Sequence, residues 1–280
     1  MWHLALETIG LSGSVALFKD TQLVSNILLP PKIGSGRSLL PAIDQMVDQA
    51  SISAADLGLI SLAIGPGSFT GLRVSVASAK ALGYALKVPL CAVDTLETLA
   101  YRLAMEFLNA REKLSNRQKV EQPAKPILIA AAMDAYRKQV FRLVARVEEP
   151  AIPQSTEKNA IQLQVLIPSH HLDVSLWKQN PFYGLQPSHY FNAKEQLVHS
   201  MMDFEQFTVI VGGNAVDRYP AGDIWPMAIS VSDPRDINAV DVGHYAWQQY
   251  LQGTPIDPFR LLPNYLRASA AEEKISSQVE

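Results

Sequence analysis

The chain has 280 residues, of which 48% are hydrophobic and 18% are charged, a composition typical of one large globular domain or two of ordinary size. The net charge of −3 argues against a protein that grips nucleic acid alone, and the single cysteine excludes an intrachain disulfide. No apolar run reaches the ~18 residues of a membrane-spanning helix. No basic, cleavable leader is recognised, so we expect a cytoplasmic protein without membrane association.

The first third of the chain predicts three strands followed by alternating helices and strands. Tight connections join the first three strands into a meander, after which apolar residues recur at helical spacing. The resulting order, βββα followed by βαβα, is typical of a mixed-sheet α/β fold. The predicted strands are 3–7, 13–18, 22–29, 57–64 and 90–93, and the predicted helices are 38–50, 72–86 and 95–109.

A polar stretch at 110–125 separates this part from a second block and is interpreted as a linker or an insertion. The second block partly repeats the first, so we expect two lobes, 1–109 and 126–267, with a frayed tail at 268–280. Its predicted elements are strands 127–133, 139–147, 163–167 and 207–211 and a late helix at 238–251.

The most informative segment is a glycine-rich loop between a predicted strand and a predicted helix. Such loops often hold phosphates, because free backbone N–H groups and the helix dipole point the same way. A tight connection whose glycines only solve a packing problem is equally consistent with the sequence. Arg73 opposes the dipole of the helix that follows, which suggests an acidic partner. The loop residues are Gly65, Pro66, Gly67, Ser68, Phe69, Thr70, Gly71 and Arg73.

Known nucleotide-binding patterns do not fit this loop. No lysine follows Gly71, which excludes a Walker A motif, and Thr70 stands where a dinucleotide fingerprint needs its third glycine. The helix after the loop is rich in small residues, which let another backbone approach closely. Packing on the sheet and contact with another chain both explain those residues.

A catalytic set is absent from the motifs. The six histidines lack the spacing of a zinc site, which disfavours a metalloprotease, and there is no nucleophile elbow. Glu7, at the end of the first predicted strand, is a candidate carboxylate for a metal in a phosphotransfer site. The turn after it supplies neither a lysine nor a second acid. We therefore assign no catalytic residue and no metal ligand.

Three segments carry a family resemblance: Leu4–Thr8 with Ser14–Leu17, the loop Gly65–Arg73, and Pro263–Arg267. Together they resemble the TsaB family, whose bacterial members act in tRNA threonylcarbamoyladenosine biosynthesis. The strand pair at 133–141 is similar to the family's pattern more loosely.

The chain also departs from the family. Glu7 stands where the family usually has Asp, and Ile9 where it usually has Ser. Ser35-Gly36-Arg37 replaces a His-Ser-Glu that often precedes the first helix.

The resemblance implies an actin-like, ribonuclease H-like fold of two lobes with mixed sheets, βββαβα in the first lobe. It implies a non-catalytic subunit that binds TsaD, the enzyme that transfers threonylcarbamoyl to N6 of adenosine 37 in tRNA. The ATPase TsaE is expected to join this complex, a homodimer is expected to use the same surface, and tRNA is expected to bind only within the complex. No cofactor is expected on the chain alone, and ATP at the interface of the complex is left open.

The two helices 38–50 and 72–86 are the predicted contact with TsaD. The alternative is an ATP-dependent phosphotransferase of the actin-like superfamily that uses Glu7 and the glycine loop. The predicted interface residues are Leu39, Leu40, Ile43, Met46, Val47, Leu72, Ser75, Val76, Ala79, Leu82 and Gly83.

Overall fold

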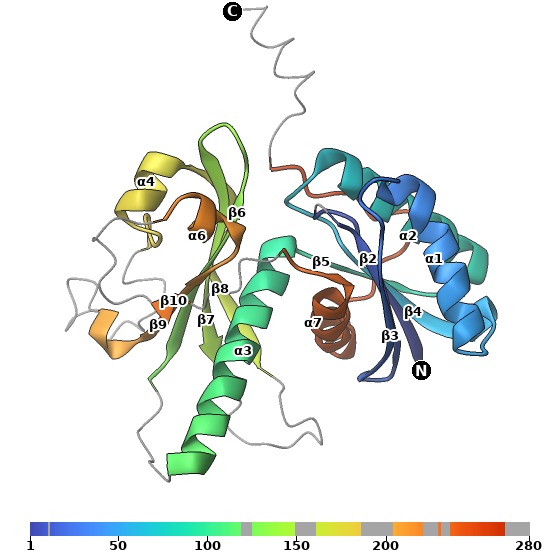
Figure 1. The fold of residues 1–280 in the computed structure, drawn as a ribbon, viewed down its shortest axis with the longest axis horizontal. Helices are drawn as coiled ribbons and strands as arrows, with labels where there is room; N and C mark the ends of the chain where they lie inside the picture. The colour runs from blue at the N-terminus through green and yellow to red at the C-terminus, as the bar shows by residue number, and fades with distance from the viewer. Residues whose placement is uncertain are drawn as a thin grey trace, which may run out of the picture. The chain divides into compact units, whose positions relative to one another are not determined.

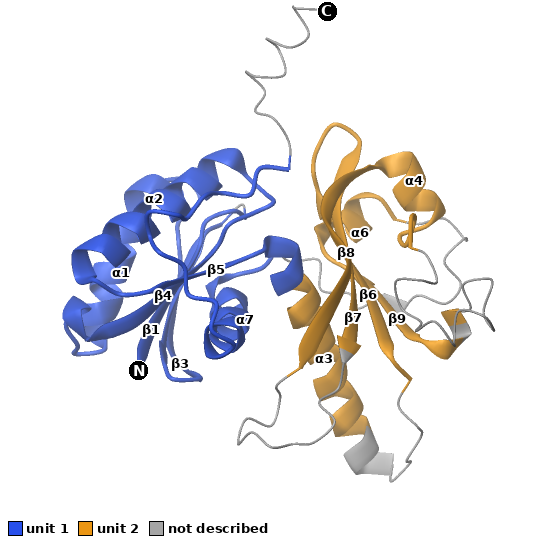
Figure 2. Ribbon diagram, turned by 180° about the vertical axis from the view of Figure 1, so that it is seen from behind, with its two compact units in different colours: residues 1–98, 236–280 blue, residues 99–235 orange. Residues whose placement is uncertain are grey.

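The computed structural model describes residues 1–10, 12–118, 125–148, 161–185, 204–220, 229–230 and 236–266. Predictions on Arg267 and on the tail 268–280 lie outside these residues. The chain forms two compact units, one of residues 1–98 with 236–280 and one of residues 99–235 (Figure 2).

The first unit is built on a five-stranded mixed sheet with the strand order β3-β2-β1-β4-β5. β1 pairs antiparallel with β2 and parallel with β4, so the meander predicted from the sequence continues into a crossover layout. Helices α1 and α2 cover one face of this sheet and α7 covers the other (Figure 1). The elements are β1 (Trp2–Glu7), β2 (Ser14–Lys19), β3 (Gln22–Leu28), α1 (Ser35–Gln49), a 3-10 turn (Ala54–Asp56), β4 (Leu57–Ala63), α2 (Phe69–Leu86), β5 (Leu90–Val93) and α7 (Ala239–Leu251).

The two faces of the first sheet have different chemistry. Because successive side chains of a strand point to opposite faces, Leu4 and Leu6 of β1 join the aliphatic core with α1 and α2. His3, which directly precedes Leu4, lies on the other face, where its ring stacks on Phe18 and on Trp247 of α7. A side chain at Gly243 would overlap the Phe18 ring, so this glycine lets α7 approach the sheet closely.

The second unit has its own five-stranded mixed sheet, in the order β10-β9-β6-β7-β8. Its core holds the fully buried Trp177, whose indole N–H donates to the Tyr219 carbonyl. The paired strands expected at 127–133 and 139–147 are confirmed, and the strand expected at 163–167 is longer. The elements are α3 (Thr95–Gln118), which begins in the first unit, β6 (Ile127–Asp134), β7 (Gln139–Glu148), β8 (Gln162–Asp173), α4 (Val174–Gln179), a 3-10 turn (Phe204–Gln206), β9 (Thr208–Gly212), α6 (Asn214–Arg218) and β10 (Ile229–Ser230).

Two features of the predicted domain division are corrected. α3 continues through Gln118, into the stretch interpreted as a linker, because Arg, Glu and Lys, as at 111–113, are residues that favour a helix. The late helix α7 belongs to the first unit, not to the second lobe. Its N-terminal residue Ala239 donates its N–H to Ser14 Oγ at 2.8 Å, and Tyr245 donates to Glu97 at 2.7 Å.

Among the helices that the structure describes, none combines the length and the apolar character needed to cross a membrane.

Candidate functional site

The glycine loop leaves β4 and enters α2 in the first unit. Gly65 has φ +112°, a value that L side chains rarely adopt, and a Cβ there would stand 2.5 Å from the Asn264 carbonyl oxygen. Ser68 caps α2, since its hydroxyl accepts the Gly71 N–H at 3.3 Å. The loop is therefore held at one side by the segment around Asn264 and at the other by its own cap.

The turn between β1 and β2 fills the inner side of this loop. A Cβ at Gly67 would overlap the Ile9 side chain, and a Cβ at Gly71 would overlap the Thr8 carbonyl. The Thr8 hydroxyl also donates to the Gly71 carbonyl oxygen at 2.7 Å. These glycines serve close packing within the chain, which is one of the two explanations left open by the sequence, and Thr8 and Ile9 occupy the side of the loop that faces the turn.

Glu7 lies beneath the same turn and is fully buried. Its Oε1 accepts the N–H groups of Ile9 and of Gly10, the latter at 2.9 Å, while Oε2 has no hydrogen-bond partner among the described residues. Burial raises the pKa of this carboxyl to about 8, the two N–H donors counteract that effect, and Asp236 and Asp241 add to it.

Within the described residues, no group of three or more His, Cys, Asp or Glu side chains could hold a metal ion. The acidic neighbours of Glu7 were missed from the sequence. Asp236 stands 229 residues after Glu7 in the chain, and only the return of α7 to the first sheet brings it near Gly10, whose added Cβ would lie 3.3 Å from Asp236 Oδ2.

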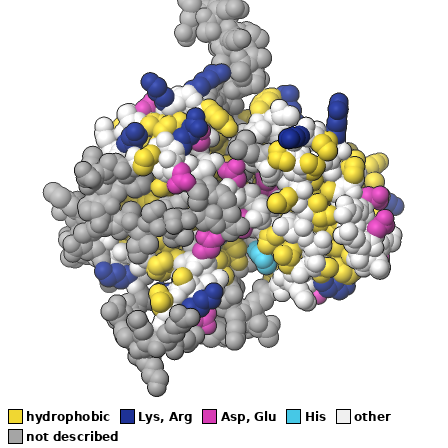
Figure 3. Space-filling model, viewed as in Figure 1, with side chains coloured by type: hydrophobic (Ala, Val, Ile, Leu, Met, Phe, Trp, Pro, Cys, Tyr) yellow, Lys and Arg dark blue, Asp and Glu magenta, His cyan; other side chains and the backbone are white. Residues whose placement is uncertain are grey.

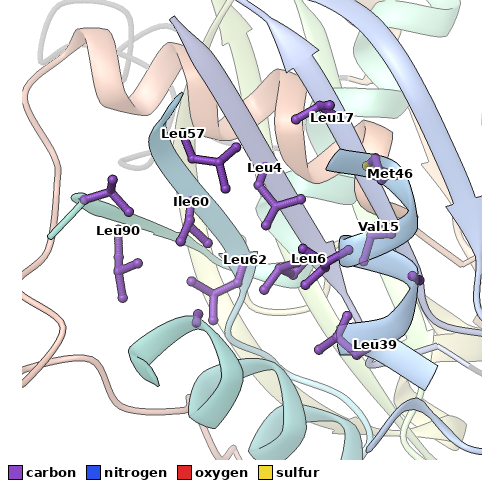
Figure 4. Packing of buried hydrophobic residues seen from close by; sticks show 14 of the residues in the cluster. Leu4, Leu6, Val15, Leu17, Leu39, Met46, Leu57, Ile60, Leu62 and Leu90 are labelled. Atoms are coloured by element: carbon purple, nitrogen blue, oxygen red, sulfur yellow. The ribbon is translucent and has the colours of Figure 1, made fainter. Parts of the chain in front are cut away.

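The predicted interface residues lie in the core rather than on the surface. The apolar stripes of α1 and α2 face the sheet, and Figure 4 shows this for α1, with Leu39 near Leu6 and Met46 near Val15. Leu40 is the exception, with 55% of its surface exposed, and Leu82 is partly buried against the core. One stripe cannot cover the sheet and meet another chain at once, so this prediction is corrected for the nine buried residues, Leu39, Ile43, Met46, Val47, Leu72, Ser75, Val76, Ala79 and Gly83.

Arg73 also has a different partner from the one expected. Its guanidinium carbon lies 4.0 Å from the centroid of the Phe69 ring, and the Tyr265 ring lies 4.6 Å from Phe69. A cation on an aromatic face offsets the unfavourable position near the helix N-terminus without an acidic partner. This stack joins α2 to the third segment of the family resemblance.

The exposed apolar surface of the first unit lies beside α2 and was missed from the sequence. Residues 256–266, here called the strap, are anchored through the Ile256 N–H to the Leu90 carbonyl at 2.7 Å and through Lys80, which donates to the Leu261 carbonyl. Phe259 and Leu262 of the strap are 72% and 71% exposed. The Phe259 ring packs edge-on at 5.5 Å against Tyr84 of α2, which is itself 67% exposed.

Comparisons with known proteins agree with this geometry. The family model "TsaD: tRNA N6-adenosine threonylcarbamoyltransferase" matches residues 35–148. The tRNA threonylcarbamoyladenosine biosynthesis protein TsaB of Bacillus subtilis is 33% identical over 100 residues, 36% of this chain and 44% of that protein. The Escherichia coli protein of the same name is 32% identical over 97 residues, 35% of this chain and 42% of that protein. The matched segments thus span less than half the length of these curated relatives.

The solved structure of YeaZ from Pseudomonas aeruginosa superimposes with a TM-score of 0.61 over 95% of this chain and 99% of that one, at 21% identity. This likeness confirms the predicted actin-like fold of two mixed α/β units over nearly the whole length. The first part of the chain is thus similar in sequence to TsaB proteins, and the chain as a whole shares its fold with YeaZ.

Proposed function

We propose that the chain is a non-catalytic accessory subunit in the formation of threonylcarbamoyladenosine in tRNA, and that its first unit binds a TsaD-type transferase. The observation that carries the proposal is the exposed apolar surface beside α2, the helix that follows the loop resembling the TsaB family. Large apolar side chains that stay exposed together are typical of a protein-binding surface. An accessory role also agrees with a loop whose glycines are used for packing within the chain.

In this proposal, exposed residues of α1, α2 and the strap contact TsaD, in place of the buried apolar stripes predicted from the sequence. Tyr84 and Phe259 form its centre, because aromatic side chains dominate the binding energy of protein interfaces. Leu262 of the strap and Leu40 of α1 are exposed as well, and we include them in the proposed contact. The same proposal includes two further partners, TsaE and a second copy of this chain. It also includes ATP as a ligand at the interface of the complex.

Co-purification with the TsaD protein of the same organism tests the proposal. We expect the double variant Tyr84→Ala/Phe259→Ala to lose association while its melting temperature stays close to that of the parent. Leu251→Ala, which truncates a side chain that is 60% exposed at the end of α7, is the matched control and should still bind. Failure of the parent to bind TsaD would refute the proposal. Full binding by the double variant would refute the proposed binding surface.

The phosphotransferase hypothesis rests on Glu7 and the glycine loop. The close packing of Thr8 and Ile9 against the inner side of the loop speaks against it. Calorimetry of the isolated chain with Mg-ATP decides the matter. Tight binding with turnover, lost in Glu7→Ala, would replace the accessory role with an enzyme.

A further inference from the structure

The hairpin between β6 and β7 in the second unit ends in an uncommon backbone conformation. Tyr136, Arg137 and Lys138 have φ values of 60°, 51° and 61° in succession. None of them is a glycine, and side chains with a Cβ seldom adopt this region. Such strain persists only where the surrounding structure enforces it, and it is a reason to look for a function.

Asp134, at the end of β6, fixes this tip. Its Oδ1 accepts the Tyr136 N–H at 2.8 Å and the Tyr219 hydroxyl at 3.1 Å, while Oδ2 pairs with Arg218 Nε at 2.8 Å. Its own N–H donates to Asn214 Oδ1 at 2.7 Å. Since both carboxylate oxygens and the N–H of Asp134 are engaged, the tip is rigidly attached to α6 and to the sheet.

The start of α4 holds the tip from the other side. The Val174 N–H donates to the Lys138 carbonyl at 3.0 Å. The carboxylate of Asp173 caps α4 through Ser175 and lies within electrostatic reach of Lys138, which lowers the pKa of that carboxyl further. The backbone of the tip is therefore supported at each end, and the side chains of Tyr136, Arg137 and Lys138 are exposed.

The projecting side chains are cationic and aromatic. Tyr136 is 61% exposed, Arg218 is 59% exposed although it pairs with Asp134, and Arg137 and Lys138 are exposed as well. Figure 3 shows Lys and Arg side chains gathered at this upper end of the second unit. The side-chain chemistry of the tip, a tyrosine beside cations, differs from that of the strap. The exposed Phe and Leu side chains of the strap are suited to binding a protein.

We propose that the tip of this hairpin is an RNA contact, in which Arg137, Lys138 and Arg218 meet phosphates and Tyr136 stacks on an unpaired base. Cations provide most of the affinity for a nucleic acid backbone, and an aromatic ring binds any base through its face. A rigid tip limits the entropy that binding would otherwise cost. Naming the RNA as tRNA rests on the proposed function.

The test measures binding of an unmodified tRNA transcript with adenosine at position 37 to the full-length chain, alone and with TsaD. We expect Arg137→Glu/Lys138→Glu to weaken binding by about tenfold or more at ~0.1 M salt and to reduce the slope of log K against log salt by about two. The control Lys32→Glu/Lys87→Glu changes the charge equally at two exposed residues of the first unit and should have a smaller effect.

A stacking contact is checked separately. Tyr136→Phe should retain the affinity of the parent, and Tyr136→Ala should lose about tenfold. Equal weakening by the two charge-reversal pairs, unchanged binding by the hairpin pair, or a parent that does not bind the transcript would each overturn the inference.

Co-purification with TsaD, measured on the same variants, keeps the two proposals apart. Hairpin variants that assemble normally but lose tRNA support the inference. A parent that binds tRNA through the hairpin but never associates with TsaD would refute the proposed function alone.

Discussion

The hydroxyl of Thr8 donates a hydrogen bond of 2.7 Å to the carbonyl oxygen of Gly71, across a separation of 63 residues. This bond ties the turn after β1 to the first turn of α2 at the point where the backbones are closest. This close approach requires glycine at position 71, since a Cβ there would overlap the Thr8 carbonyl.

Gly71→Ala is therefore expected to destabilise the chain by about 1–3 kcal/mol or more, because the new methyl group overlaps the rigid Thr8 carbonyl. Gly36→Ala is the matched control. A Cβ at Gly36, inside α1, meets only Val74 at 3.6 Å, and alanine favours a helix by about 0.5–1 kcal/mol. Chemical denaturation should show opposite signs for the two variants, and equal stabilities would contradict the close packing.

The raised pKa of Glu7 predicts that the stability of the folded chain decreases as the pH rises. Its pKa is about 8 in the folded chain and 4.5 as the ordinary value, so the folded state binds the proton more tightly. Stabilisation by this proton is complete below pH ~4.5 and is lost progressively up to pH ~8, with an upper bound on the order of 5 kcal/mol. Glu7→Gln retains an acceptor for the Ile9 and Gly10 N–H groups and should gain stability over the parent across that window.

Thermal melts at pH 5 and pH 8 measure this difference. The control Asp44→Asn replaces one exposed carboxylate on α1 and should show no comparable change. A Glu7→Gln advantage that is the same at both pH values would show that Glu7 is ionised in the folded state.

Arg137→Gly should raise the stability of the second unit by about 1 kcal/mol, because glycine adopts a positive φ without the clash of a Cβ. Lys178→Gly, in the last turn of α4, removes a cation from a regular helix and should lower stability instead. Denaturation curves distinguish the two. A destabilising Arg137→Gly would mean that the Arg137 side chain contributes more to folding than its backbone costs.

Ala79→Leu distinguishes a core position from a surface one. Ala79 is fully buried in α2 against the first sheet, so a larger side chain is expected to cost about 1–3 kcal/mol by overpacking. Circular dichroism and denaturation should therefore detect a weakened fold, whereas Leu40→Ala on α1 should leave the stability nearly unchanged. A stable Ala79→Leu would indicate that α2 can move away from the sheet.

Local patterns were sufficient to predict most of the first unit. The meander, α1 and α2 follow from alternation and helical spacing of apolar residues, which report burial on one face. These patterns do not show whether the buried face packs on the chain's own sheet or on another chain. The small residues of α2 suggested a second chain, yet Ala79 and Gly83 lie on its own sheet, and a Cβ at Gly83 would meet the Leu90 side chain at 2.7 Å.

Long-range features were not accessible in the same way. Helix 238–251 was recognised from its spacing, but its assignment to the second lobe followed chain order. Contacts such as Ala239 with Ser14 span 225 residues, and no local pattern encodes them. The left-handed tip at 136–138 carries no glycine, so the residues gave no sign of its positive φ values.

The return of α7 makes the second unit an insertion within the first. Residues 99–235 separate the strands of the first sheet from the helix that covers one of its faces. During synthesis, His3 and Phe18 therefore stay uncovered until nearly the whole chain has been made and α7 can pack on them. A nascent chain halted before residue 236 would expose this half-covered sheet to chaperones, and the insertion thus sets the order in which the two units can be completed.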